Sequence, residues 1–161
     1  MAVFGAPITL EDRAVRACLA ALGLQEEAKR LALEVHDRDG VQLQLRVGLN
    51  SGQVIAGEIG SGALGYTAGG EQVGLAQRME SVAPLGGVML SASTARLVDG
   101  AAAVGELELV RIKGADEPVP ARRLLGSGGM GEVYLAQQPR LTVAALLLNL
   151  GEGPESAGYR L

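Results

Sequence analysis

The chain has 161 residues, a net charge of −4, three tyrosines, one phenylalanine and no tryptophan, so we expect one modest domain with an aliphatic core. Neutralising a polyanion needs clustered Lys and Arg, so nucleic acid is not an expected partner. A single cysteine, Cys18, and a single histidine, His36, exclude an internal disulfide and a histidine-rich metal site. The longest apolar run, Leu141–Leu150, is far below the ~20 residues of a membrane span, so a cytoplasmic protein is expected.

The first forty residues predict a strand followed by a long helix. Met1–Ala6 is an apolar run that Pro7 stops, and it reads as the second arm of a hairpin. From Thr9 onward, apolar residues recur every three or four positions as far as Val35, which marks an amphipathic helix. Thr9 is expected to cap this helix, and Gly40 is expected to end it.

The middle of the chain predicts a hairpin that leads into a second helix. Residues 41–50 read as a strand, Ser51-Gly52 as a tight turn, and Gln53–Ile59 as a second strand. A glycine-rich loop follows, and a helix is expected to open near Gly70. Such a loop lets a backbone approach a nucleotide closely, because glycine has no side chain in the way.

The remaining elements complete an α+β domain. They are a strand at Val88–Leu90, a short helix at Ser91–Val98 capped by Ser91 or Ser93, a strand at Glu106–Ile112, a polar turn at 113–118 and a final edge strand at Val119–Leu124. In this order, we expect helices on one face of a mainly antiparallel sheet.

Two motifs in the middle of the chain resemble one protein family. Residues 46–61 read RVGLNSGQVIAGEIGS, and residues 66–80 read YTAGGEQVGLAQRME. Both, in register, look like the C-terminal half of the catalytic domain of class III nucleotidyl cyclases, the adenylate and guanylate cyclases. The resemblance covers residues 1–125. It implies that family's ferredoxin-like core, without its first strand and without the first arm of its metal-binding hairpin.

The resemblance implies roles for four positions. Arg78 matches an arginine that neutralises the transition-state phosphate, and Lys113 matches a basic loop residue that contacts the triphosphate. Thr67 lies where threonine goes with adenine, so ATP is the expected nucleotide. Gly74 replaces an asparagine that orients the ribose, so slow chemistry is expected. The residues alone leave two alternatives: Arg78 is a solvated helix arginine paired with Glu80, and Lys113 is an ordinary turn lysine.

The resemblance also implies magnesium as a cofactor. In the family, metal ions held by two aspartates act as Lewis acids on the triphosphate. Both aspartates correspond to positions before Met1, and no carboxylates of this chain are expected to replace them. The chain is therefore expected not to convert ATP to cyclic AMP alone. The alternatives are a regulatory half-domain that completes the site of an intact cyclase in a homodimer or heterodimer, and a truncated reading frame without function.

The composition shifts at Gly126. Residues 125–136, LGSGGMGEVYLA, resemble the glycine-rich loop of bacterial Ser/Thr kinases. Leu146 occupies the place of the phosphate-pairing lysine, so kinase activity is not expected. Residues 126–161 are expected to form a loop remnant and a tail outside the 1–125 domain. A sheet without its first strand has unpaired edges, which predicts a marginal monomer that tends to associate.

Overall fold

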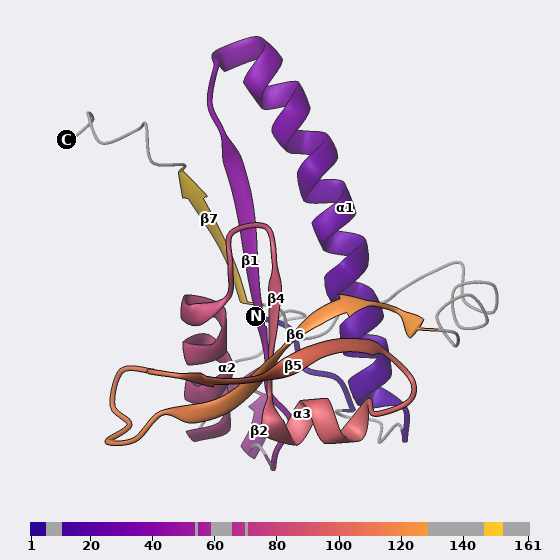
Figure 1. Cartoon of the computed structure of the whole chain (residues 1–161), viewed down its shortest axis with the longest axis vertical. Coiled ribbons are helices and arrows are strands. Elements are labelled where there is room, and N and C mark those ends of the chain that lie inside the picture. Colours follow the sequence, from indigo (N-terminus) through magenta and orange to yellow (C-terminus); the bar gives the residue numbers. More distant parts are fainter. Residues whose placement is uncertain (6–10, 54, 59–65, 70, 129–146, 153–161) are drawn as a thin grey trace.

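The computed structural model describes residues 1–5, 11–53, 55–58, 66–69, 71–128 and 147–152. These residues form three helices and seven strands (Figure 1). Their order is α1 (Arg13–Asp39), β1 (Leu43–Leu49), β2 (Ile55–Glu58), β3 (Tyr66–Gly69), α2 (Glu71–Val82), β4 (Val88–Ser91), α3 (Ala92–Leu97), β5 (Ala103–Val110), β6 (Val119–Gly126) and β7 (Leu147–Glu152). The expected α+β class is confirmed.

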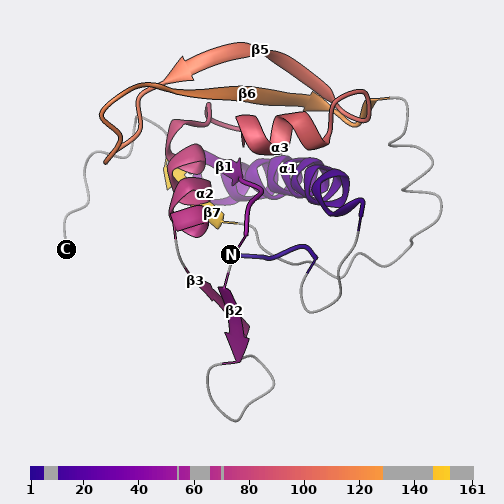
Figure 2. The same ribbon diagram turned by 90° about the horizontal axis from the view of Figure 1, so that it is seen from below.

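Five of the strands form one sheet in the order β5-β6-β4-β1-β7. The β1–β4 pair is parallel, and the other three pairs are antiparallel. β2 and β3 form a separate antiparallel hairpin that projects from the body of the molecule (Figure 2). The strand β6 therefore lies inside the sheet, and the expectation that it is an edge strand was wrong: β5, which folds back on it, is the edge.

Helices cover both faces of the sheet, which corrects the expectation that they lie on one face. Val88 and Leu90 of β4 belong to a cluster with α1 and α3, whereas Met89 belongs to a cluster with α2. Because consecutive side chains of a strand point to opposite faces, α1 and α3 lie on one face and α2 on the other. The entirely buried β4 is typical of a strand that is covered on both sides.

The long helix α1 confirms the first predicted amphipathic pattern. Ala14, Ala17, Cys18 and Ala21 recur at helical spacing and are buried against β1. The helix begins after Asp12, and the predicted cap Thr9 lies outside the described residues. At the other end, Gly40 takes the left-handed conformation with φ of 71°, as expected for a glycine that ends a helix.

Because Cys18 is buried, we expect the stability of the domain to fall at alkaline pH. The side chain is 1% exposed, and desolvation raises the pKa of its thiol from 9.0 to about 12. Between these values the unfolded chain loses the thiol proton while the folded chain keeps it, so stability falls as pH rises. At about pH 10 we expect this loss to reach roughly 1 kcal/mol. Urea unfolding at neutral and alkaline pH measures it, and Cys18→Ala, which lacks the thiol, should show a correspondingly shallower dependence.

The N-terminal residues do not form the expected strand. Residues 1–5 have no regular secondary structure, although Ala2 and Phe4 pack against the α1–β1 core. A strand requires a neighbour with which to share hydrogen bonds, and the available edge of β1 is occupied by β7. The apolar pattern thus marked residues that pack on the core, and it did not determine their backbone conformation.

The predicted hairpin at Ser51-Gly52 was wrong, because β1 pairs with β4 and β7, whereas β2 pairs with β3. The bounds of the remaining predicted elements differ little from those observed. Ser91 caps α3 as expected, its hydroxyl oxygen accepting a bond of 3.4 Å from the backbone nitrogen of Thr94. The predicted glycine-rich loop is interrupted by β3, which pairs with β2. Residues 129–136 of the kinase-like segment lie outside the described residues, so that resemblance stays a prediction.

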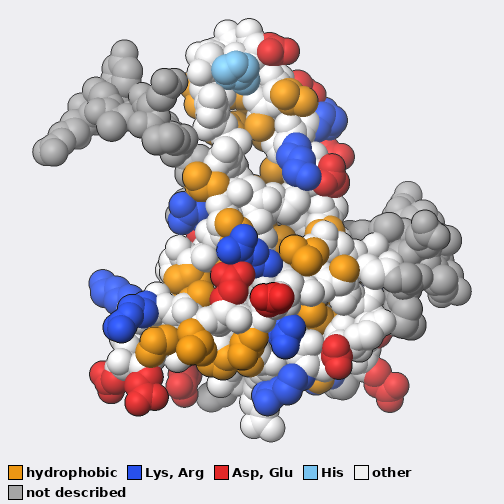
Figure 3. Space-filling view, in the orientation of Figure 1, with side chains coloured by type: hydrophobic (Ala, Val, Ile, Leu, Met, Phe, Trp, Pro, Cys, Tyr) orange, Lys and Arg blue, Asp and Glu red, His pale blue; other side chains and the backbone are white. Residues whose placement is uncertain are grey.

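The surface in Figure 3 carries basic and acidic side chains interspersed with apolar ones. Leu107 and Leu109 of β5 are 55% and 70% exposed and form part of the apolar surface of the β5–β6 ribbon. Among the described segments, none of the helices combines the length and apolar character of a membrane span.

Candidate functional site

Helix α2 carries two of the four predicted site residues, Gly74 and Arg78. Its apolar residues Leu75, Met79 and Val82 recur at helical spacing and pack in the cluster that contains Ile112. Met79 is 1% exposed, so it anchors this side of the helix. Arg78 precedes Met79 in the chain and is only partly buried, so its side chain starts from the rim of the packed face.

The guanidinium of Arg78 lies over Gly74. A Cβ built on Gly74 would be 3.8 Å from Nη2 and 3.9 Å from both Cζ and Nη1 of Arg78. Residues four apart lie on one face of a helix, which accounts for this approach. The contact distance is ordinary, so a Cβ at position 74 can be accommodated beside the guanidinium.

The turn after β5 reaches the same guanidinium. A Cβ built on Gly114 would lie 3.8 Å from Arg78 Nη2, and Gly114 has a φ of 82° that side chains rarely adopt. Lys113, the preceding residue, is exposed, whereas Ile112 is buried beneath α2. The structure therefore brings Gly74 and Arg78 of α2 together with the turn that carries Lys113, which lies more than thirty residues further along the chain.

Arg78 and Lys113 bring two positive charges to this site, and Asp116 and Glu117 follow in the same turn as Lys113. Among the described residues, none of the ion pairs found involves Arg78 or Lys113, and Glu80 is buried at 7% exposure. The alternative in which Arg78 pairs with Glu80 was therefore wrong. Glu80 is one of the buried residues of α2, whereas the guanidinium of Arg78 extends toward Gly114. A cationic group without a protein carboxylate can bind an anion directly.

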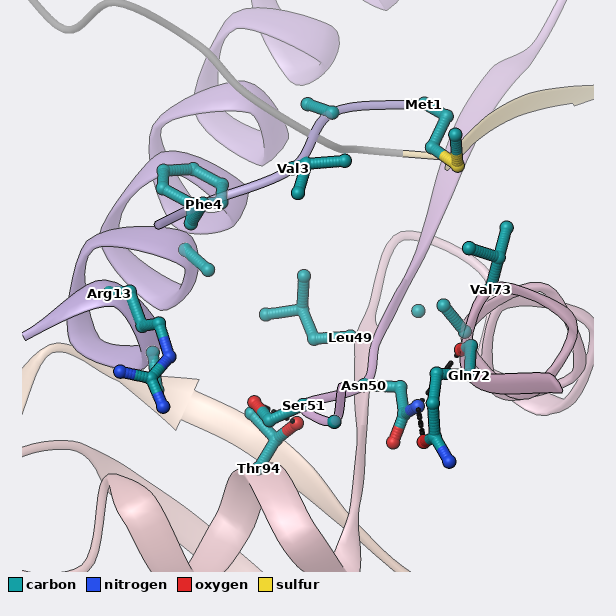
Figure 4. Close-up of a pocket in the computed structure, with 16 residues that line it drawn as sticks. Met1, Val3, Phe4, Arg13, Leu49, Asn50, Ser51, Gln72, Val73 and Thr94 are labelled. Atoms are coloured by element: carbon teal, nitrogen blue, oxygen red, sulfur yellow. Dashed lines mark hydrogen bonds between the residues drawn. The ribbon is translucent and has the colours of Figure 1, made fainter. Parts of the chain in front are cut away.

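A polar network that the sequence did not predict holds the first turn of α2. The Asn50 side-chain amide donates to the backbone oxygen and to Oε1 of Gln72, both at 2.9 Å (Figure 4). Ser93 Oγ donates to Asn50 Oδ1 at 3.1 Å, and the hydroxyls of Ser51 and Thr94 lie 3.0 Å apart. The network joins the end of β1, α2 and α3, so it positions the helix that carries Arg78. The only sequence signal was an asparagine directly after a strand.

Close contact with β1 holds α2 at its other end. A Cβ built on Gly48 would overlap the backbone nitrogen of Glu80 and the backbone oxygen of Ala76. Only glycine lets the helix backbone approach the strand this closely. The glycine in the 46–61 motif thus has a packing role that determines how far α2, and hence Arg78, lies from the sheet.

Thr67 lies on β3, opposite Gly57 of β2. This hairpin precedes α2 in the chain and packs near it. The Thr67 side chain lies outside the described set, so its role in adenine selection stays a prediction.

Magnesium, which the resemblance implies, requires oxygen ligands, usually carboxylates. Within the described ranges, no group of three His, Cys, Asp or Glu side chains lies close enough to hold a metal ion. The two side chains assigned to the α2 site, Arg78 and Lys113, are cationic. A cationic side chain is not a metal ligand, so Arg78 and Lys113 do not themselves provide a magnesium site.

Comparison with known proteins agrees with the resemblance. Residues 1–124 match the family described as the adenylate and guanylate cyclase catalytic domain. Guanylate cyclase soluble subunit beta-2 of Rattus norvegicus is 38% identical over 81 residues, which are 50% of this chain but only 11% of that protein.

Two solved structures are also similar. The guanylate cyclase domain of RhGC from Catenaria anguillulae in complex with GTP has a TM-score of 0.66 and 31% identity, covering 77% of this chain and 65% of that one. The adenylyl cyclase CyaB from P. aeruginosa has a TM-score of 0.69 and 26% identity, covering 78% and 66%. The family match spans most of the chain and includes both motifs and the α2 site. The chain belongs to the family of adenylate and guanylate cyclase catalytic domains.

Proposed function

We propose that the chain provides the phosphate-binding half of a nucleotidyl cyclase site and acts with a second cyclase domain that provides the metal-binding aspartates. One observation carries the proposal: the Arg78 guanidinium lies at the meeting point of α2 and the Lys113-Gly114 turn, close to Gly74 and Gly114. At this point two cationic residues from separate elements, Arg78 and Lys113, can face one triphosphate. By itself, the chain is proposed to be inactive.

The chemistry of Arg78 suits a phosphate. Its planar guanidinium carries five donors that match phosphate oxygens. In cyclisation, charge develops on the oxygens of the α-phosphate as the 3′-oxygen attacks it. A cation already in place stabilises that charge without reorganisation. The anchored face of α2 and the Asn50–Gln72 contact supply this positioning.

The arginine and the lysine contact phosphates, so they do not decide which purine base the site binds. Thr67 favours ATP, as expected from the motif, whereas the rat relative is named a guanylate cyclase and the Catenaria structure contains GTP. We propose a purine nucleoside triphosphate as the substrate class. ATP and GTP should therefore be tested side by side.

Complementation with a defective partner tests the proposal. The partner is a cyclase domain that retains both metal aspartates and carries alanine at its own arginine. Adding the full chain should restore cyclic nucleotide formation, and Arg78→Ala should lower the restored rate by about a hundredfold, the typical loss for one transition-state donor. Binding of a labelled triphosphate to the chain alone should weaken by about tenfold, because one charge-assisted contact is lost.

Arg96→Ala is the matched control, because Arg96 is an exposed arginine on the short helix α3. It should leave both the restored rate and triphosphate binding unchanged. Equal losses from the two alanine variants would show a general effect of charge and contradict the assignment of Arg78. Failure of the unmodified chain to associate with the partner would contradict the half-site proposal itself.

A further inference from the structure

A cavity of about 410 Å³ lies between the second half of α1 and the beginning of β1. The two elements run side by side in the upper part of the molecule (Figure 1). Residues 42–45 and Gly86 line the cavity together with a stripe of α1 whose members recur every three or four positions: Gln25, Ala28, Lys29, Ala32, Leu33 and His36. This lining contains no residue of α2, so the cavity is separate from the Arg78 site. Its volume is in the range of sites that bind small molecules.

Gln25 brings a buried polar group to this cavity. Only 5% of the residue is exposed, and its Nε2 donates to the backbone oxygens of Leu45 at 3.1 Å and of Gly87 at 3.0 Å. These two bonds use both amide hydrogens and tie α1 to the strands. Among the described residues, none donates a hydrogen bond to Gln25 Oε1. This oxygen is therefore the polar atom that the side chain presents to the cavity, and an N–H or O–H group of a ligand can bond to it.

The walls near Gln25 are apolar. Ala28 and Ala32 of α1 are half-buried, and Leu45 of β1 is 4% exposed. Leu43 is two residues before Leu45 in the strand, so it points to the same face of the sheet, toward α1. The small alanine side chains leave space between the helix and the strand. A flat ring system suits this space, because a rigid ligand loses less conformational freedom on binding than a flexible chain.

The mouth of the cavity carries a positive charge. Among the lining residues, all of which the structure describes, Lys29 alone has a formal charge at neutral pH. Its Nζ lies 2.7 Å from Oε1 of Glu26, in a pair whose side chains are 62% and 73% exposed. An exposed ion pair of this kind contributes little to stability, so Lys29 can instead bind an anion at the mouth. His36, two turns further along the same face of α1, adds a hydrogen-bonding imidazole.

We propose that this cavity is a binding site for a small, flat, apolar monoanion that carries one N–H or O–H donor. The donor bonds to Gln25 Oε1, the ring packs between the alanines of α1 and Leu45, and the anionic group lies at the mouth beside Lys29. Nothing in this site depends on nucleotide binding at α2. Indole-3-butyrate combines the required groups, since it has an indole N–H, a flat ring system and a carboxylate on a short chain, so it serves as the probe.

Indole-3-butyrate and its 1-methyl derivative, each titrated into the full chain, test the role of Gln25. The chain contains no tryptophan, so emission from the indole ring reports the probe alone. We expect saturable binding of indole-3-butyrate with a Kd of about 1 mM or lower. The 1-methyl derivative should bind about tenfold more weakly, because it has no donor for the buried Gln25 Oε1. Absence of saturable binding, or equal affinities for the two probes, would overturn the proposal.

Ala32→Phe tests where the probe binds. The larger side chain would occupy the space between α1 and β1, so the affinity for indole-3-butyrate should fall by about tenfold or more. Leu31→Phe is the matched control, because Leu31 is the adjacent residue, is 45% exposed and does not line the cavity. It should leave the affinity unchanged, and urea unfolding shows that both variants are folded. Equal affinities of the two folded variants would place the probe elsewhere and refute this site. The comparison of the two probes uses the unmodified chain, so it does not depend on the folding of either variant.

Lys29→Gln tests the anionic end of the ligand. This substitution should weaken binding of indole-3-butyrate by about threefold, as expected for one exposed charge contact, and should leave binding of the corresponding neutral alcohol unchanged. Arg30→Gln is the control, because Arg30 is the next cation of α1 and does not line the cavity. Equal losses from the two glutamine variants would show a general effect of charge and contradict the assignment of an anion to this site.

Discussion

Replacing Gly74 with asparagine is expected to raise the complemented cyclase rate by about a hundredfold. The introduced amide would restore the group that the resembling enzymes use to orient the ribose. The structure accommodates a Cβ at this position, because its three nearest neighbours are guanidinium atoms of Arg78 at 3.8–3.9 Å. The measurement is the kcat for cyclic nucleotide formation with the partner that supplies the metal aspartates.

Gly74→Ala separates chemistry from helix stability. Glycine inside a helix costs roughly 1 kcal/mol relative to alanine, so this control should be the more stable of the two variants. It lacks a polar group, however, and should leave kcat near that of the unmodified chain. If alanine and asparagine raise the rate equally, the gain comes from a stiffer α2, and the positioning role is refuted.

Replacing Gly48 with alanine is expected to destabilise the domain by about 3 kcal/mol, at the upper end for overpacking by one methyl group. The added Cβ would lie 2.7 Å from Glu80 Cα and would overlap backbone atoms of Ala76 and Glu80. Backbone atoms of a packed helix cannot rotate away as a side-chain end can, so α2 must move. Urea unfolding gives the loss, and the same shift should reduce triphosphate binding by displacing Arg78.

Gly23→Ala is the control for this substitution. Gly23 lies within α1, and a Cβ built there meets nothing within 4 Å. This alanine should therefore stabilise the domain by roughly 1 kcal/mol. A Gly48→Ala variant as stable as the unmodified chain would show that α2 does not depend on this close approach to β1.

Local patterns predicted the elements whose formation depends on neighbouring residues. The spacing of Ala14, Ala17, Cys18 and Ala21 predicted α1, and Ser91 predicted the start of α3, because helix faces and caps are properties of a few adjacent residues. The apolar run Met1–Ala6 was predicted to be a strand, whereas residues 1–5 have no regular secondary structure. A strand depends on a partner that can be anywhere in the chain, and here β7 took the position beside β1.

The sequence also predicted some features of the candidate site and not others. The motif around Arg78 and Gly74 was visible in the sequence, and so was its likeness to the cyclases, which the comparisons confirmed. The contribution of Asn50 and Gln72 was not, because their hydrogen bond joins residues 22 positions apart.

By itself, the sequence determined the family, the amphipathic helices and the residue types available for phosphate chemistry, since these depend on motif and local periodicity. Only the tertiary structure decided that α2 lies on the face opposite α1, that Gly114 meets Arg78, and that β7 completes the sheet. These features arise from contacts between segments distant in sequence, whose formation depends on packing of the whole chain rather than on the preference of any one segment.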